Sequence, residues 1–304
     1  MAEARPTTRY NQPVFIVGVP RSGTTLLQAI LCNSGEYFPM PETHFFSRVT
    51  YGLPKDNLSA EDRKKLHRVL AKKSRIKVDE ELLHELNSKK EVFEYIIGTF
   101  NSDGKNTFLE KTPRHVFFYS EIMQYYQDAK FICMVREPKN SVSSLLTMSA
   151  RREKSAVRIS IFYNKLAKAI LNIMNNSNVL IVRYEDLTDK SELTLRGICK
   201  FLNITYSSSL INNAVAPAGI VSAHEIWKNR NIELDGIQKN NPDRWRKVLS
   251  QGRADMVTYI TKSYASQFGY SLAYDRAAVF NGFVQDIGKL LSWKELRKAL
   301  SKGY

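Results

Sequence analysis

Short apolar runs alternate with longer amphipathic segments along most of the chain. The uninterrupted apolar runs 14–19 and 131–135 have the pattern of strands buried on both faces, and weaker strand patterns cover 107–110 and 178–182. Residues at helical spacing follow these runs. In chain order the predicted helices cover 24–32, 114–127, a segment from Pro138, 155–175 and 190–202. Because strands alternate with helices, the pattern predicts an α/β domain of three layers, αβα, with a mainly parallel central sheet.

Three segments depart from this alternation. Residues 45–106 are helical and basic without a strong strand pattern, and we interpret them as an insertion within a single domain over 13–272 that shapes an acceptor pocket. Residues 1–12 are polar and predict a flexible N-terminus. Residues 273–304 predict an amphipathic, basic helical extension. We expect this extension to pack against the domain or a partner subunit, and contact with an anionic membrane surface is the alternative.

The composition narrows the classes of protein to which the chain can belong. Of its 304 residues 43% are hydrophobic, which excludes disorder, and 45 Lys and Arg against 30 Asp and Glu leave a net charge of +15. That charge favours anionic partners. The apolar runs fall short of the roughly 20 residues of a membrane span, and no signal peptide is apparent, so we expect a cytoplasmic protein. Three scattered cysteines predict neither a metal site nor a disulfide framework.

The first candidate site lies between the first predicted strand and the first predicted helix. Pro20-Arg21-Ser22-Gly23-Thr24-Thr25-Leu26 places a glycine and small hydroxyl residues at the helix start. Backbone N–H groups and the positive end of the helix dipole attract an oxyanion there, and Arg21 adds a forked donor. The loop is P-loop-like but lacks the Gly-Lys-Ser/Thr ending of a Walker A motif. Simple helix capping is the alternative interpretation.

The second candidate site follows the strand predicted over 131–135. Arg136 stands at the strand end and Ser144 lies two helical turns later, so both side chains can converge on one phosphate. Walker-type enzymes place a Mg²⁺-binding Asp at such a strand end. An arginine in that place indicates a site that neutralises anionic charge with cations rather than with a metal ion.

Together these motifs resemble those of the sulfotransferases that use 3′-phosphoadenosine-5′-phosphosulfate (PAPS), over about 14–249. The resemblance implies that the first loop holds the 5′-phosphosulfate, that Arg136 and Ser144 hold the 3′-phosphate, and that Tyr184 lies near the adenine. Segment 241–247 resembles the one that closes over the nucleotide. The cofactor-binding residues implied in this way are Arg21, Ser22, Gly23, Thr24, Thr25, Leu26, Arg136, Ser144, Tyr184 and Lys239.

Two further stretches resemble catalytic segments of particular branches of that family. Residues 41–46, Pro-Glu-Thr-His-Phe-Phe, resemble the Glu-x-His-Phe-Phe stretch of the glycosaminoglycan sulfotransferases, and Glu42 also falls where tyrosyl-protein sulfotransferases carry a catalytic Glu. Residues 110–113 resemble the Glu-Lys-Thr/Ser-Pro stretch of the glycosaminoglycan enzymes. The resemblance implies Glu42 as the general base, with His44 as the second choice. It also implies Arg21 and Lys111 as the cations beside the transferring group.

The implied reaction is the in-line transfer of a sulfuryl group from PAPS to an acceptor hydroxyl, or less favourably an amine, without a metal ion. A carbohydrate, a glycolipid or a small metabolite is the expected acceptor, and nucleic acid is not an expected partner. Two alternatives stay open. One is a small-molecule or nucleotide kinase with a degenerate P-loop. The other is a non-catalytic polyanion-binding protein that uses the basic stretch 63–77.

Overall fold

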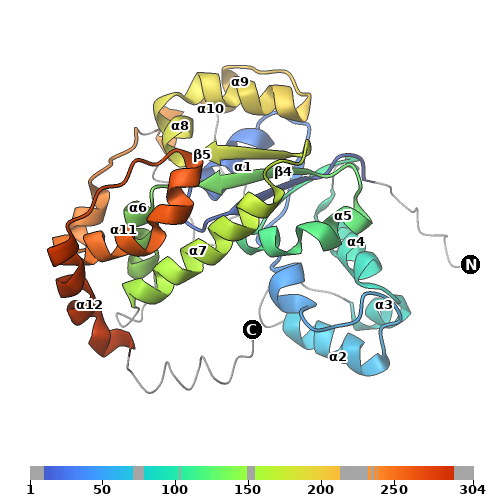
Figure 1. Ribbon diagram of the computed structural model, residues 1–304. Coiled ribbons are helices and arrows are strands. Elements are labelled where there is room, and N and C mark those ends of the chain that lie inside the picture. Colours follow the sequence, from blue (N-terminus) through green and yellow to red (C-terminus); the bar gives the residue numbers. More distant parts are fainter. Residues whose placement is uncertain are drawn as a thin grey trace, which may run out of the picture.

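The computed structural model describes residues 10–70, 79–102, 104–148, 155–212, 232–233, 236–237 and 239–290. In that part of the chain, a five-stranded parallel sheet lies between two layers of helices (Figure 1). Its strands, from one edge to the other, are β2 (Phe38–Pro39), β3 (Phe108–Lys111), β1 (Val14–Gly18), β4 (Lys130–Val135) and β5 (Val179–Arg183). This arrangement confirms the predicted three-layer α/β fold with a parallel sheet.

The helices lie in both layers and in a helical lobe beside them. They are α1 (Thr24–Cys32), the π-helix η1 (Phe45–Val49), α2 (Ala60–Val69), α3 (Glu80–Glu85), α4 (Lys89–Phe100), the 3₁₀-helix η3 (Pro113–Phe118), α5 (Tyr119–Tyr125), α6 (Pro138–Thr147), α7 (Ala156–Ile173), α8 (Tyr184–Asp189), α9 (Ser191–Leu202), α10 (Ser209–Asn212), the 3₁₀-helices η5 (Arg244–Lys247) and η6 (Ser266–Phe268), α11 (Gln251–Ala265) and α12 (Arg276–Leu290). A separate antiparallel pair joins β6 (Ile232–Glu233) to β7 (Gly236–Ile237).

Alternate residues of the central strands pack on opposite faces of the sheet, as the pleat requires. Val14 and Ile16 belong to an apolar cluster shared with α1 and α9. Phe15 and Val17 belong to a larger cluster shared with α4, α5 and α7. All four side chains are buried, which explains why β1 is visible in the sequence as an uninterrupted apolar run.

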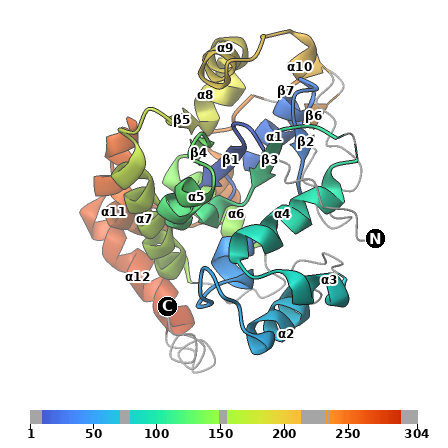
Figure 2. The ribbon, with the colours of Figure 1, turned by 90° about the vertical axis from the view of Figure 1, so that its right-hand side faces the viewer.

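The structure differs from the predicted elements at several boundaries. The helix predicted over 114–127 begins as the 3₁₀-helix η3, in which His115 and Phe118 are three residues apart and lie on one face. Strand β3 extends to Lys111, one residue beyond the predicted end. Strand β2 was not predicted, because two residues cannot show a period. The insertion 45–106 holds α2, α3 and α4, which form the lobe at the lower right of Figure 1 and lie together again in Figure 2.

The C-terminal helices α11 and α12 pack tightly along each other. Gly252 and Gly282 allow this approach, since a Cβ on Gly282 would overlap the carbonyl of Gly252. The carboxylate of Asp286 then accepts hydrogen bonds from Ser155 Oγ at 2.5 Å, from the Val157 N–H at 3.0 Å and from Arg253 Nη2 at 2.9 Å. Helix α12 therefore caps the start of α7.

Three predicted segments lie partly outside the described residues. These are the N-terminus over 1–9, the basic stretch from residue 71 and the C-terminal extension over 291–304. Within the described ranges, no helix is both long enough and apolar enough to cross a membrane.

Candidate active site

Most of the predicted site residues lie at or just after the carboxyl ends of the five parallel strands. Glu42 follows β2, Lys111 ends β3, Arg21 follows β1, Arg136 follows β4 and Tyr184 follows β5. Strand β1 pairs in parallel with β3 and β4, with Ile16 opposite Lys111 and Gly18 opposite Met134. The carboxyl ends of these strands therefore lie side by side, which is where ligands bind in such folds. Gly18 has a φ of +123°, and a Cβ there would overlap the Met134 carbonyl, so the chain leaves β1 in close contact with β4.

The loop after β1 is held in place by its own polar groups. The Ser22 side chain is fully buried, and its hydroxyl donates to the carbonyls of Val19 at 2.5 Å and Met134 at 3.1 Å. Arg21 and Gly23 both have positive φ values, +72° and +83°. The hydroxyl of Ser22 thus holds the shape of the loop. The resemblance counts Ser22 among the cofactor-binding residues, and that role stays a prediction.

Helix α1 begins at this loop with its N-terminal amides uncapped. Gly23 occupies the cap position, and no side chain of the described residues caps the helix. The first N–H groups of an α-helix have no acceptor within the helix, so Thr24 and Thr25 present amides at the positive end of the dipole. Leu26 is buried in the core beside the sheet. Its side chain therefore packs inward and offers no surface for stacking on a base.

The two candidate sites of the sequence meet in one cluster. Arg21 Nε donates to Ser144 Oγ at 3.0 Å, and Arg136 Nη1 donates to the backbone carbonyl of Arg21 at 3.1 Å. The guanidinium of Arg136 lies 4.0 Å above the ring of Tyr184. That ring also closes against Gly23, where a Cβ would come within 2.6 Å of it. Arg21, Gly23, Arg136, Ser144 and Tyr184 are therefore immediate neighbours.

The cluster is a concentration of buried positive charge. Arg136 is only 6% exposed, and its Nε has no hydrogen-bond partner in the part of the chain that the structure describes. Burial lowers the pKa of Arg21 and of Arg136, and the charge of Arg244 lowers both further. A group of cations with an unused buried donor is suited to a multiply charged anion.

Arg244 was not among the predicted site residues. It is exposed and begins η5, whose next residue, Trp245, is buried. The segment is also fastened to α6, because Asn140 Nδ2 donates to the Pro242 carbonyl at 2.9 Å. The only signal in the sequence was the segment 241–247 as a whole. Lys239, the predicted cation of this region, is exposed, and no interaction in the described ranges connects it with the arginines.

A second group of charges surrounds Glu42, after β2. Lys111 Nζ donates to Glu42 Oε1 at 2.6 Å, and His44 Nε2 lies 3.4 Å from Oε2. Burial opposes ionisation of Glu42, but Lys111 and His44 outweigh it and hold the pKa of Glu42 well below its usual range. The structure therefore brings together the three side chains that the resemblance singled out.

The two groups share one electrostatic environment. The carboxylate of Glu42 raises the pKa of Arg21, in opposition to the effect of Arg136. A ligand with one end at the N-terminus of α1 therefore has the Glu42–Lys111 pair on one side and the Arg136–Ser144 pair on the other.

A buried network holds the Glu42 segment against β3, and the sequence did not reveal it. Glu110 is fully buried and accepts from the hydroxyls of Thr43 at 2.9 Å and Thr112 at 2.5 Å. His115 Nδ1 lies 3.0 Å from its other oxygen. Despite burial, His115 and the two hydroxyls lower the pKa of Glu110. Glu42 is thus positioned through its neighbour Thr43.

A family model described as the sulfotransferase family matches residues 13–208, about two thirds of the chain. The chain belongs to this family. The match confirms the predicted family.

The chain is similar to several named proteins. Protein-tyrosine sulfotransferase 1 of Danio rerio is 25% identical over 246 residues, which cover 76% of this chain and 65% of that protein. Protein-tyrosine sulfotransferase 2 of Gallus gallus is 23% identical over 248 residues, which cover 76% of this chain and 62% of that protein. This chain thus spans less than two thirds of the length of either relative.

Solved structures share the fold. The sulfotransferase domain from the curacin biosynthetic pathway superposes with a TM-score of 0.59 at 21% identity, covering 87% of this chain and all of that one. The corresponding domain of the Synechococcus PCC 7002 olefin synthase superposes with a TM-score of 0.57 at 20% identity, covering 89% of this chain and 99% of that one.

Proposed function

We propose that this sulfotransferase takes PAPS as its donor and releases 3′-phosphoadenosine-5′-phosphate (PAP). The carrying observation is the convergence of Arg21, Arg136 and Ser144 beside the uncapped start of α1. The unpartnered Nε of buried Arg136 fits a phosphate that completes its hydrogen bonds. The lowered pKa values of the two arginines indicate that anionic charge would stabilise the site.

The donor's two charged ends would occupy different parts of the cluster. Arg21 and the amides of Thr24 and Thr25 would hold the 5′-phosphosulfate, and Arg136 with Ser144 would hold the 3′-phosphate. One face of the Tyr184 ring packs against the guanidinium of Arg136, and the edge of the ring packs against Gly23. The role of Tyr184 would therefore be to hold Arg136 in place beside the adenine. Arg244 and Lys239 would add long-range attraction.

We further propose Glu42 as the general base for the acceptor. In the free chain Lys111 Nζ lies 2.6 Å from Glu42 Oε1, so the two side chains form an ion pair with each other. PAPS would supply an activated sulfuryl group together with negative charge. Lys111 would turn toward that charge, which would raise the pKa of Glu42 and let its oxygen take the acceptor proton. Arg21 and the α1 amides would stabilise the charge that develops on the leaving phosphate.

The proposed acceptor is a hydroxyl. The relatives are named as protein-tyrosine sulfotransferases, which adds a peptide tyrosine to the carbohydrate, glycolipid or small metabolite expected from the sequence. Transfer of ³⁵S from labelled PAPS to a tyrosine peptide, a glycan and a phenol would distinguish them. We expect each productive acceptor to lose its label with Glu42→Gln.

Calorimetry with PAP in metal-free buffer tests the donor. We expect the wild type to bind and Arg136→Ala to lose about a hundredfold in affinity, because the substitution removes a charge-assisted pair of donors. Arg196→Ala is the matched control, since Arg196 pairs with Glu192 on the exposed face of α9. No binding of PAP, combined with binding of ATP·Mg²⁺, would contradict the donor and favour the kinase alternative.

A further inference from the structure

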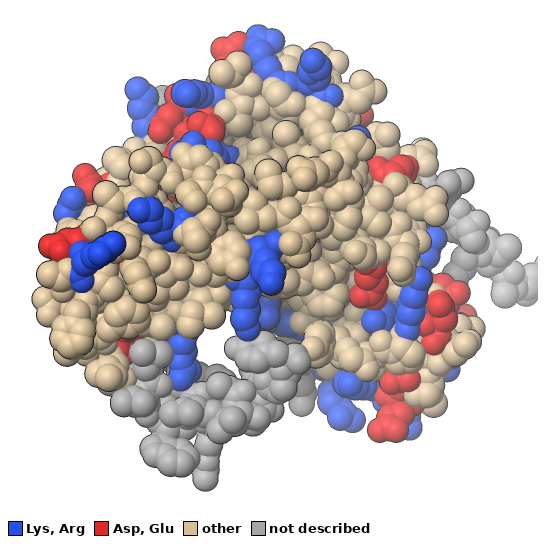
Figure 3. Space-filling model, viewed as in Figure 1, with Lys and Arg blue, Asp and Glu red and all other residues tan. Residues whose placement is uncertain are grey.

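An exposed apolar stripe follows the outer face of α12. Phe280, Val284 and Ile287 are four and three residues apart, so they lie on one face of the helix. They are 70%, 53% and 53% exposed. Tyr259 of α11, 54% exposed, extends the stripe across the neighbouring helix. In Figure 3, which has the view of Figure 1, the surface around α12 is mainly uncharged, with a few charged side chains beside it. We call these four residues the α12 face.

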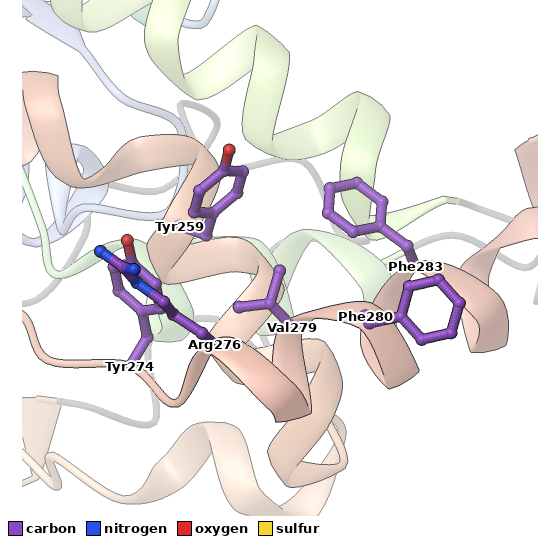
Figure 4. Close-up of a pocket in the computed structure, with 6 residues that line it drawn as sticks. All are labelled: Tyr259, Tyr274, Arg276, Val279, Phe280 and Phe283. Carbon is purple, nitrogen blue, oxygen red and sulfur yellow. The ribbon is translucent and has the colours of Figure 1, made fainter.

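A hollow of about 500 Å³ opens beside this face. It is lined by Tyr259, Tyr274, Arg276, Val279, Phe280 and Phe283. Figure 4 shows Arg276 and the two tyrosines at one end and the two phenylalanines at the other. Lys262 lies 5.4 Å above the ring of Tyr274 at the polar end. The hollow is therefore amphipathic, with cations and phenol groups beside an apolar floor.

Two exposed cations, Lys262 and Arg276, and one exposed carboxylate, Asp275, lie beside the α12 face. Arg253 is paired with the buried Asp286. Between residues 251 and 290 the chain has three acidic side chains, Asp255, Asp275 and Asp286. Asp255 and Asp286 are buried, and Asp275 accepts from the Ala277 N–H at the start of α12. The next 14 residues add four Lys and Arg and one Glu to this end of the sequence.

We propose that the α12 face binds the surface of an anionic lipid membrane. Apolar side chains flanked by lysines and arginines, with tyrosines at the boundary, are the composition of interfacial helices. A second copy of this chain fits less well, because a two-fold contact would bring Arg276 and Lys262 toward their own copies in a chain of charge +15. The buried anchor of Asp286 and the Gly252–Gly282 contact hold the face rigidly outward.

Vesicle co-sedimentation of the full chain tests the proposal. We expect binding to vesicles of 30% phosphatidylserine in phosphatidylcholine to exceed binding to phosphatidylcholine alone by about tenfold or more at 0.1 M salt. The variant Phe280→Glu/Ile287→Glu should lose about tenfold in partitioning. The control Leu193→Glu/Met174→Glu adds the same two negative charges at exposed apolar positions elsewhere, on α9 and directly after α7. It should change partitioning less than threefold.

Three results would overturn the proposal. The first is no binding of the wild type to anionic vesicles. The second is an equal loss in both double variants, which would leave net charge as the whole cause. The third is a wild-type dimer in light scattering that Phe280→Glu/Ile287→Glu dissociates without any vesicle binding, which would assign the face to a second copy. The assay requires no donor or acceptor, so its outcome is independent of the proposed sulfuryl transfer.

Discussion

At the scale of single residues, a substitution of Glu42 tests the proposed chemistry most directly. Glu42→Gln keeps the shape of the side chain and removes the proton acceptor. We expect kcat to fall by about 10²- to 10⁴-fold, with PAP affinity within about threefold of the wild type. Glu36→Gln, at an exposed position before β2, is the control. An unchanged kcat in Glu42→Gln, measured by transfer of ³⁵S, would remove Glu42 as the base.

Lys111 determines the pH dependence that follows from this assignment. A base acts in its ionised form, and Lys111 and His44 hold the pKa of Glu42 well below its usual range in the free chain. The pH dependence of kcat/KM reports groups of the free enzyme. If kcat/KM falls at a pH above the ordinary pKa of a glutamate, the group that titrates there should therefore not be Glu42. Lys111→Ala removes a cation and leaves the burial, so the pKa of Glu42 should rise and an acid limb should move to higher pH.

A profile of kcat/KM against pH for both proteins checks this shift. Arg48→Ala serves as control, because Arg48 is an exposed cation on the neighbouring π-helix. An acid limb at the same pH in Lys111→Ala and the wild type would contradict the pairing of Lys111 with Glu42.

At the scale of elements, Asp286 connects the C-terminal helix to the domain. Asp286→Ala leaves the Arg253 guanidinium and the first amides of α7 without their acceptor, and we expect a loss of about 3 kcal/mol in the free energy of unfolding. Burial opposes ionisation, but Ser155, the α7 amides and Arg253 lower the pKa of Asp286. Its stabilisation is therefore present above the unfolded pKa and is lost as pH falls through the folded pKa.

Urea denaturation at neutral and acidic pH measures both effects. The difference between wild type and Asp286→Ala should be largest at neutral pH and should shrink as the solution becomes acidic. Asn281→Ala, at an exposed position of the same helix, should stay within about 0.5 kcal/mol of the wild type. A difference that does not depend on pH would mean that packing, and not the carboxylate, fastens α12.

The elements that the sequence predicted well are those buried on both faces. Helices cover strands β1 and β4 on each side, so β1 and residues 131–135 of β4 are uninterrupted apolar runs that the sequence shows. The motif residues were predictable because they stand where strands end and helices begin. The Glu110–His115 pair was not, since a buried charge that meets its partner through a 3₁₀ turn leaves no periodic pattern. Arg244 was not predictable either, because its place beside the site depends on the tertiary packing of Trp245, which lies more than 60 residues beyond β5 in the chain.

At the scale of the whole molecule, the distribution of charge separates two kinds of cation. Arg136 is buried beside the first loop, while Arg244 is exposed and acts on it from outside. Salt screens exposed charges strongly and buried charges much less. The exposed cations should therefore govern how fast and how far an anionic donor is attracted, and the buried ones should govern what it contacts once bound.

This separation predicts how salt acts on the reaction. Between 0.05 and 0.5 M ionic strength the Debye length falls from about 14 Å to about 4 Å, so KM for PAPS should rise by about tenfold or more, while kcat should change little. Arg244→Gln should raise KM at low salt and flatten its dependence on salt, because it removes an exposed charge that acts on both buried arginines. Arg196→Gln removes an equally exposed charge on α9 that is paired with Glu192, and its profile should follow the wild type. Steady-state kinetics along a salt series would show this. A KM that stays flat up to high salt in the wild type would mean that the charge of +15 does not serve the donor, and would leave the membrane surface as its main partner.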